Sequence, residues 1–208
     1  MKNERGMSLI ELLVAMVILG IVLAGVTTYI ADQVKTVRQQ EMLANTQQNL
    51  RAAMDLITRD LRSAEYDVTN NPTTSPFREF QTATDTQVIF YTDINGNGAI
   101  NNITTRSDSN EVKGYLKRSA QDSIYIQVRD AAPKTWEAVA GNIQTLRFTY
   151  YDINDDSMAF PIQGQRLRDI FKVRVAIQAR TPRRWSTSVD TLRRQLIGVV
   201  QIRSRQGI

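Results

Sequence analysis

The 208-residue chain contains no cysteine and no histidine. Without cysteine, disulfides, thiolate nucleophiles and cysteine-based metal sites are excluded. Without histidine, the commonest general base and the commonest metal ligand are missing, and neither a Ser–His–Asp nor a Cys–His catalytic arrangement can form. Carboxylate or lysine chemistry remains, but no grouping of such residues nominates an active site. We therefore expect that the protein is not an enzyme.

Acidic residues are scarce in the C-terminal part of the chain. The whole sequence has 26 Lys and Arg against 21 Asp and Glu, a net charge of +5. Residues 166–208 hold eleven of the cations and only two acids, Asp169 and Asp190. Such a segment is suited to phosphate, anionic lipid or an acidic protein face. The alternative is a set of solvated strand faces.

The N-terminal segment is almost free of charge after its first six residues. Lys2 and Arg5 lie in residues 1–6, and the run Met7–Ala31 is almost wholly apolar, with Glu11 as its only charge. A helix over this run is about as long as the hydrocarbon core of a membrane is thick. The positive-inside rule predicts that the short basic end lies in the cytoplasm.

Two ordinary interpretations of this run leave Glu11 unexplained. A cleaved secretory signal would be cut near Val22 and Ala24, but the apolar run is long for such a signal. A plain single-span anchor would hold a lone carboxylate in lipid, which costs about 2.5–3.5 kcal/mol on insertion scales.

A third interpretation accounts for the carboxylate. Residues 5–15 read RGMSLIELLVA, and this segment closely resembles the class III signal of type IV pilins and pseudopilins. The resemblance implies that a prepilin peptidase cuts after Gly6 and that the new N-terminus, Met7, is N-methylated. It also implies that Glu11 neutralises an N-terminal amine in the assembling filament. A buried carboxylate is tolerated once a cation pairs with it.

The segment departs from the family pattern at two positions. Met7 stands where phenylalanine is usual, and Thr28 stands where major pilins often carry a helix-kinking proline. Thr27 and Thr28 could still bend the helix by hydrogen bonding back to carbonyl groups.

Helical periodicity continues beyond the apolar run and ends before a β-rich region. No proline or glycine interrupts Val26–Tyr66, so one helix is predicted from Ser8 to Tyr66. Its second half has apolar residues at intervals of three and four: Leu50, Ala53, Met54, Ile57, Leu61 and Ala64. The expected divisions are a leader (1–6), a membrane and filament-core half of the helix (7–31), an amphipathic half (32–66) and a β-rich domain (67–208).

The β-rich domain begins with a predicted loop over residues 67–86. Alternation of period two then predicts strands at Gln87–Thr92, Glu111–Lys117, Ser123–Arg129, Thr135–Ala140, Ile143–Asp152, Ile170–Arg180 and Gln195–Arg203. The expected fold class is α+β, with one long helix packed on a mainly antiparallel sheet.

The loop after the first of these strands resembles the start of a calcium-binding loop. Its oxygen ligands would be Asp93, Asn95 and Asn97, but the twelfth position is Thr104 rather than glutamate. The alternative is a glycine-rich turn. A second partial match comprises Asp152, Asn154 and Asp156. No cofactor other than calcium is predicted.

The helix from Asn49 to Arg62 resembles that of PilW-type minor pilins and of J-type pseudopilins of type II secretion. The leading hypothesis is a PilW-like minor pilin that primes or tips a type IV pilus. The alternatives are a J-type pseudopilin and a DNA-binding uptake pilin. The expected partners are other pilin or pseudopilin subunits, prepilin peptidase and the inner-membrane assembly platform. The expected location is the inner membrane, single-pass with a periplasmic C-terminus, and then a pilus or pseudopilus.

Overall fold

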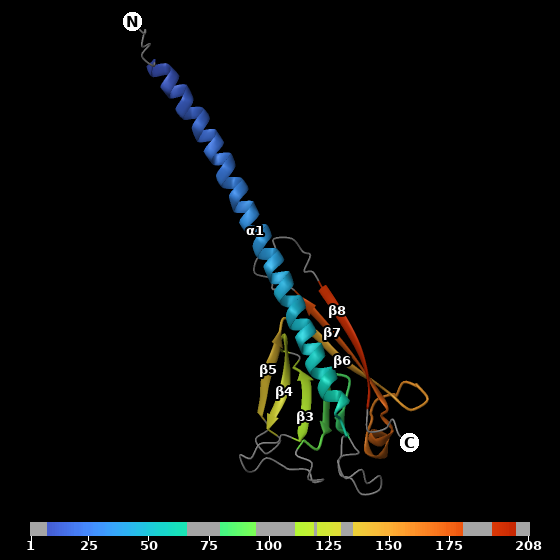
Figure 1. Cartoon of the computed structure of the whole chain (residues 1–208). Coiled ribbons are helices and arrows are strands. Elements are labelled where there is room, and N and C mark those ends of the chain that lie inside the picture. The colour runs from blue at the N-terminus through green and yellow to red at the C-terminus, as the bar shows by residue number, and fades with distance from the viewer. Residues whose placement is uncertain are drawn as a thin grey trace. The chain divides into compact units, whose positions relative to one another are not determined.

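A computed structural model describes residues 8–65, 80–94, 111–118, 120–129, 135–180 and 193–202. The chain divides into two compact units, Met1–Ala44 and Asn45–Ile208. The first unit contains the N-terminal part of helix α1 (Leu9–Arg62), and the second contains the rest of this helix and every strand (Figure 1).

Helix α1 changes character along its length. Every side chain from Leu9 to Glu41 is exposed. Farther on, one stripe is buried at the expected spacing: Thr46, Leu50, Ala53, Met54, Ile57, Asp60 and Leu61. The helix ends at Arg62, earlier than the predicted Tyr66, because Glu65 takes a left-handed backbone conformation with φ of 60°. The Glu65 amide donates a 2.8 Å hydrogen bond to the Tyr91 carbonyl oxygen, which ties the chain to the sheet.

The strands form two antiparallel sheets. Sheet A has the order β1 (Phe80–Ala83), β2 (Gln87–Tyr91), β3 (Val112–Lys117), β4 (Ser123–Arg129) and β5 (Thr135–Gly141). Sheet B has the order β6 (Ile143–Tyr151), β7 (Lys172–Arg180) and β8 (Arg193–Gln201). The predicted α+β class and all seven predicted strands are confirmed, with ends that differ by at most two residues. The sequence patterns missed β1, which lies within the predicted 67–86 loop, and the 3₁₀ helix η1 (Gly164–Asp169).

A sharp turn carries the chain from sheet A to sheet B. Asn142 joins β5 to β6 with a φ of 59°. Strand β6 then hydrogen-bonds to turns of sheet A: the Ile143 amide donates to the Asp122 carbonyl (3.0 Å) and the Phe148 amide donates to the Asp85 carbonyl (2.8 Å). The two sheets also share one hydrophobic core, since a single cluster contains buried residues of both.

Within the second unit, α1 lies against strands of both sheets (Figure 1), and its buried stripe belongs to the same hydrophobic cluster as buried residues of both sheets. At sheet B, a Cβ atom added to Gly198 would lie 2.8 Å from Met54 Sδ and 3.1 Å from Thr58 Cγ2, so any larger residue would require these side chains to move. At sheet A, Asp60 Oδ2 accepts hydrogen bonds from Tyr115 Oη (2.7 Å) and Lys113 Nζ (3.1 Å). The predicted alternation in β7 is also confirmed, since Val173, Val175, Ile177 and Ala179 are fully buried.

Candidate functional site: an exposed apolar helix with one carboxylate

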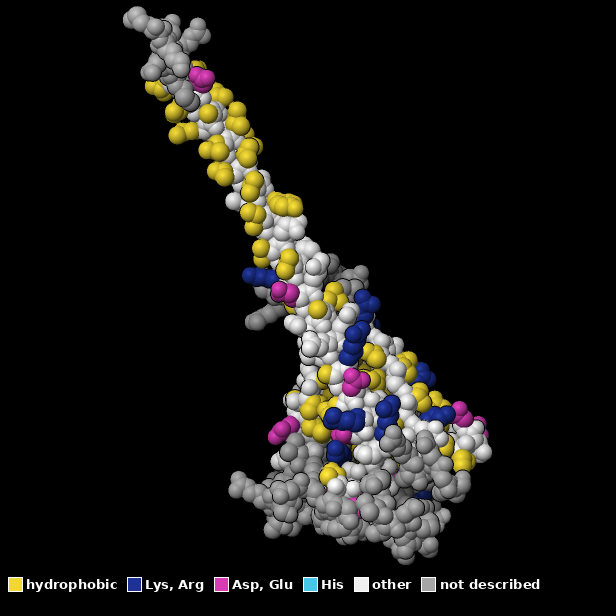
Figure 2. Space-filling model, in the orientation of Figure 1, with side chains coloured by type: hydrophobic (Ala, Val, Ile, Leu, Met, Phe, Trp, Pro, Cys, Tyr) yellow, Lys and Arg dark blue, Asp and Glu magenta, His cyan; other side chains and the backbone are white. Residues whose placement is uncertain are grey.

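The N-terminal part of α1 exposes an almost continuous apolar surface (Figure 2). Leu9 is 83% exposed, Ile10 72% and Ile21 68%. An 18-residue window of the helix has a mean hydropathy of 2.8, and none of it is buried. The helix is long and apolar enough to cross a membrane. An uncovered surface of this kind needs lipid or other helices around it.

Glu11 is the single charge on this surface. The helix begins beside it, since the Glu11 and Leu12 amides donate to the Ser8 carbonyl oxygen at 3.0 and 3.2 Å. An acid in the first turn is favoured by the helix dipole. No ion pair with Glu11 forms among the residues that the structure describes. Gly6 and Met7 lie outside those residues, so cleavage and methylation at these positions stay predictions.

The two threonines of the apolar segment bond back to the helix as expected. Thr27 Oγ1 and Thr28 Oγ1 both donate to the Ala24 carbonyl oxygen, at 3.0 and 2.8 Å. The helix is continuous through this point. These hydroxyl groups are thus satisfied within the helix and do not expose unpaired donors to an apolar environment.

The first predicted calcium loop is only partly within the described residues. Asp93 is 2% exposed, while Asn95 and Asn97 lie outside the described residues. Where the structure describes the chain, no group of three or more acidic side chains could hold a metal ion. Calcium at Asp93, Asn95 and Asn97 therefore stays a prediction.

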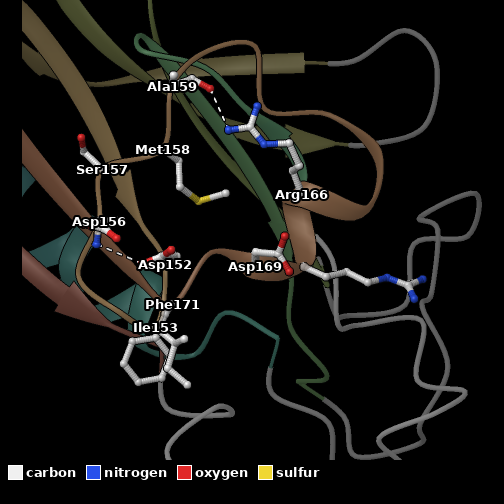
Figure 3. A pocket seen from close by; sticks show the side chains of 10 residues that line it. Asp152, Ile153, Asp156, Ser157, Met158, Ala159, Arg166, Asp169 and Phe171 are labelled. Carbon is white, nitrogen blue, oxygen red and sulfur yellow. Dashed lines mark hydrogen bonds between the residues drawn. The ribbon is translucent and has the colours of Figure 1, made fainter.

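Two members of the second partial calcium match, Asp152 and Asp156, line a pocket of about 640 Å³ between the β6 end and η1 (Figure 3). Asp152 Oδ1 accepts hydrogen bonds from the amides of Asn154 and Asp156, both at 2.9 Å. Across the pocket, Arg166 donates to the carbonyl oxygens of Ala159 and Pro161, each at 3.1 Å. These groups shape the loop itself, and Asp152 acts as a turn-forming side chain here.

A buried polar cluster beneath α1 was not predicted from the sequence. Asp60 is 4% exposed and lies in the last turns of the helix. Burial and the hydrogen bond to Asp60 raise the pKa of the Tyr115 hydroxyl above its usual value. Burial also raises the pKa of Tyr150, with a smaller contribution from the Asp85 carboxylate. The only sequence signal was an acid on the apolar stripe, between Ile57 and Leu61.

Comparison with known proteins agrees with this architecture. Residues 1–27 match the prokaryotic N-terminal methylation motif. Residues 39–201 match the family described as prepilin peptidase-dependent protein B. No curated protein matches the chain. Among solved structures, a type IV-like pilin from Thermus thermophilus is similar at 12% identity, with 76% of this chain and 96% of that chain covered and a TM-score of 0.47.

The methylation motif, the apolar helix and the α+β fold define a type IV pilin-like protein, a structural subunit and not an enzyme. The chain belongs to the prepilin peptidase-dependent protein B family, whose profile covers residues 39–201. Processing by prepilin peptidase and pilus-type assembly follow from this membership. The resemblance found in residues 5–15 is thereby confirmed.

Proposed function

We propose that this chain is a minor pilin of the PilW type. It is held in the inner membrane by the apolar part of α1, is cut after Gly6 and is methylated at Met7. It then joins a helical bundle that primes or tips a type IV pilus. The observation that supports this most is the exposed apolar surface of α1 from Leu9 to Ala31, on which Glu11 is the only charge.

The mechanism is assembly. In the membrane, lipid covers the apolar side chains of α1, and in the filament the helices of neighbouring subunits cover them instead. Glu11 then sets the axial position, because it is stabilised only where the Met7 amine of a neighbouring subunit meets it. A wrong position leaves the carboxylate unpaired in an apolar environment, at about 2.5–3.5 kcal/mol on insertion scales.

The orientation follows from the charges at the start of the chain. Lys2 and Arg5 hold that end in the cytoplasm, so the single span places the C-terminal unit in the periplasm. Cleavage after Gly6 then takes place on the cytoplasmic side. The globular unit stays in the periplasm, where the filament grows.

The test compares incorporation into sheared surface filaments for Gly6→Ala and Glu11→Ala. Glu4→Ala in the leader is the matched control for the first variant, and Glu41→Ala on an exposed part of α1 is the control for the second. We expect both controls to be incorporated normally and both site variants to stay in the membrane. Normal incorporation of Gly6→Ala and Glu11→Ala would refute the proposal.

The same strains separate the pilus from a type II secretion pseudopilus, in which a J-type subunit would share the leader and helix. Loss of surface filaments with normal secretion of exoproteins supports the minor pilin. Loss of secretion with normal filaments assigns the chain to the secretion system.

A further inference from the structure

The outer face of sheet B combines exposed cations with exposed aliphatic side chains. Register places side chains of the three strands in rows across it, since directly paired residues point to the same side. One row is Arg147, Ala176 and Ile197, and the next is Thr149, Arg174 and Val199. The opposite face packs into the core beneath α1.

Two of the cations on this face are neutralised by ion pairs, and three are not. Lys172 pairs with Asp155 at 2.6 Å, and Arg180 pairs with Asp122. Arg147, Arg174 and Arg193 make no ion pair or hydrogen bond with a side chain of the described residues. The outer face of sheet B therefore carries an excess of positive charge toward solvent.

Two aliphatic side chains lie among these cations. Ile197 is 46% exposed and Val199 is 56% exposed, both on strand β8. Strand β8 pairs with β7 over nine consecutive residue pairs without a bulge, and its other edge has no strand partner in the described part of the chain. Edge strands are usually protected by proline, lysine, a bulge or a cover. The segment Ile197–Gln201 has none of the first three.

We propose that the outer face of sheet B and the edge of β8, which has no strand partner among the described residues, bind an extended, acidic strand of a partner protein. Added beside β8, such a strand would hydrogen-bond to backbone groups along this edge and set its aliphatic side chains against Ile197 and Val199. Its carboxylates would face Arg193 on β8 and Arg174 on the neighbouring strand β7. Arg147, on the far strand β6, adds to the positive potential of the face rather than contacting the added strand. A nucleic acid fits less well, because its phosphates would meet the two aliphatic side chains. This surface goes beyond the proposed function and does not depend on cleavage or on Glu11.

The test places a photo-crosslinking amino acid at position 199 of the full chain in membranes of its host. We expect a covalent product with a protein, in which the linked peptide is extended and rich in Asp or Glu. The double variant Arg147→Glu/Arg174→Glu should lower the yield of this product at least fivefold. The control is Arg51→Glu/Arg62→Glu, an equal charge change on exposed positions of α1, and it should leave the yield unchanged.

Thermal unfolding of both double variants tests whether each remains folded. The proposal is overturned if no product forms, or if the product persists at full yield in Arg147→Glu/Arg174→Glu. A nuclease-sensitive product or a link to the same face of a second copy also overturns it, since two cationic faces repel each other. Replacement of an acidic residue of the cross-linked partner peptide by lysine should restore the yield of the product with Arg147→Glu/Arg174→Glu.

Discussion

Replacement of Asp60 by alanine should cost the second unit a large part of its stability. Asp60 is buried near the C-terminal end of α1, where the negative end of the helix dipole disfavours an acid. It is held there by Lys113 Nζ at 3.1 Å and Tyr115 Oη at 2.7 Å, with Arg59 Nε at 3.6 Å. Asp60→Ala removes the acceptor and leaves the Tyr115 hydroxyl buried without it.

The size of the effect follows from these contacts. Breaking a buried ion pair by removing one partner costs about 3–5 kcal/mol. The Lys113 side chain is 25% exposed, so water can solvate its ammonium group in part once the carboxylate is removed. We therefore expect a loss of stability at the lower end of this range, about 3 kcal/mol. For a chain of this size that lowers Tm by about 6–12 °C. Asp60→Asn keeps an oxygen for Tyr115 and should cost less.

The assay is thermal or denaturant unfolding of the full chain in detergent, followed by near-UV circular dichroism. Asp55→Ala is the matched control, since it removes an exposed carboxylate from the same part of α1 and should change the free energy of unfolding by less than about 0.5 kcal/mol. If Asp60→Ala unfolds with the same midpoint as Asp55→Ala, the claim that this cluster anchors α1 on sheet A is wrong.

Three further predictions follow from other contacts. Gly198→Val should destabilise the protein by about 1–3 kcal/mol, because its Cβ would meet Met54, whereas Gly141→Val, with open space around its Cβ, should cost less in the same unfolding assay. The pKa values of Tyr115 and Tyr150 are raised in the folded state, so these hydroxyl groups should not affect stability below about pH 10. Above that pH, the free energy of unfolding should fall by up to about 1.4 kcal/mol per pH unit for each tyrosine. Urea midpoints that stay flat between about pH 10 and 11.5 would contradict this. If calcium binds at Asp93, a tenfold excess over its Kd should stabilise the protein by about 1.4 kcal/mol, and Asp93→Asn should abolish the shift in Tm; an unchanged wild-type Tm would remove the calcium prediction.

Local sequence patterns predicted most of the fold. The features that they did not predict include a short strand and the division of the strands into two sheets. The apolar run with Glu11 and the stripe from Leu50 to Leu61 were readable because each depends on a single helix. The strand β1 was missed because four residues in a segment rich in threonine, asparagine and proline are too few to show alternation. The split into two sheets depends on the turn at Asn142, whose φ no pattern specifies.

The same distinction applies to the site residues. The leader and Glu11 were predicted because cleavage and assembly act on a contiguous motif. The Asp60 cluster was not, because its partner Lys113 lies 53 positions away in the sequence. The cationic outer face of sheet B was half visible in the charge count of residues 166–208, but only strand register shows which cations share a face with Ile197 and Val199.

The most direct test of the assembly account is N-terminal mass analysis of the native protein from its host membrane and filaments. We expect a chain that starts at Met7 with a methylated amine. A polypeptide intact from residue 1, or one trimmed beyond Ala24 and released as a free monomer, would contradict the account.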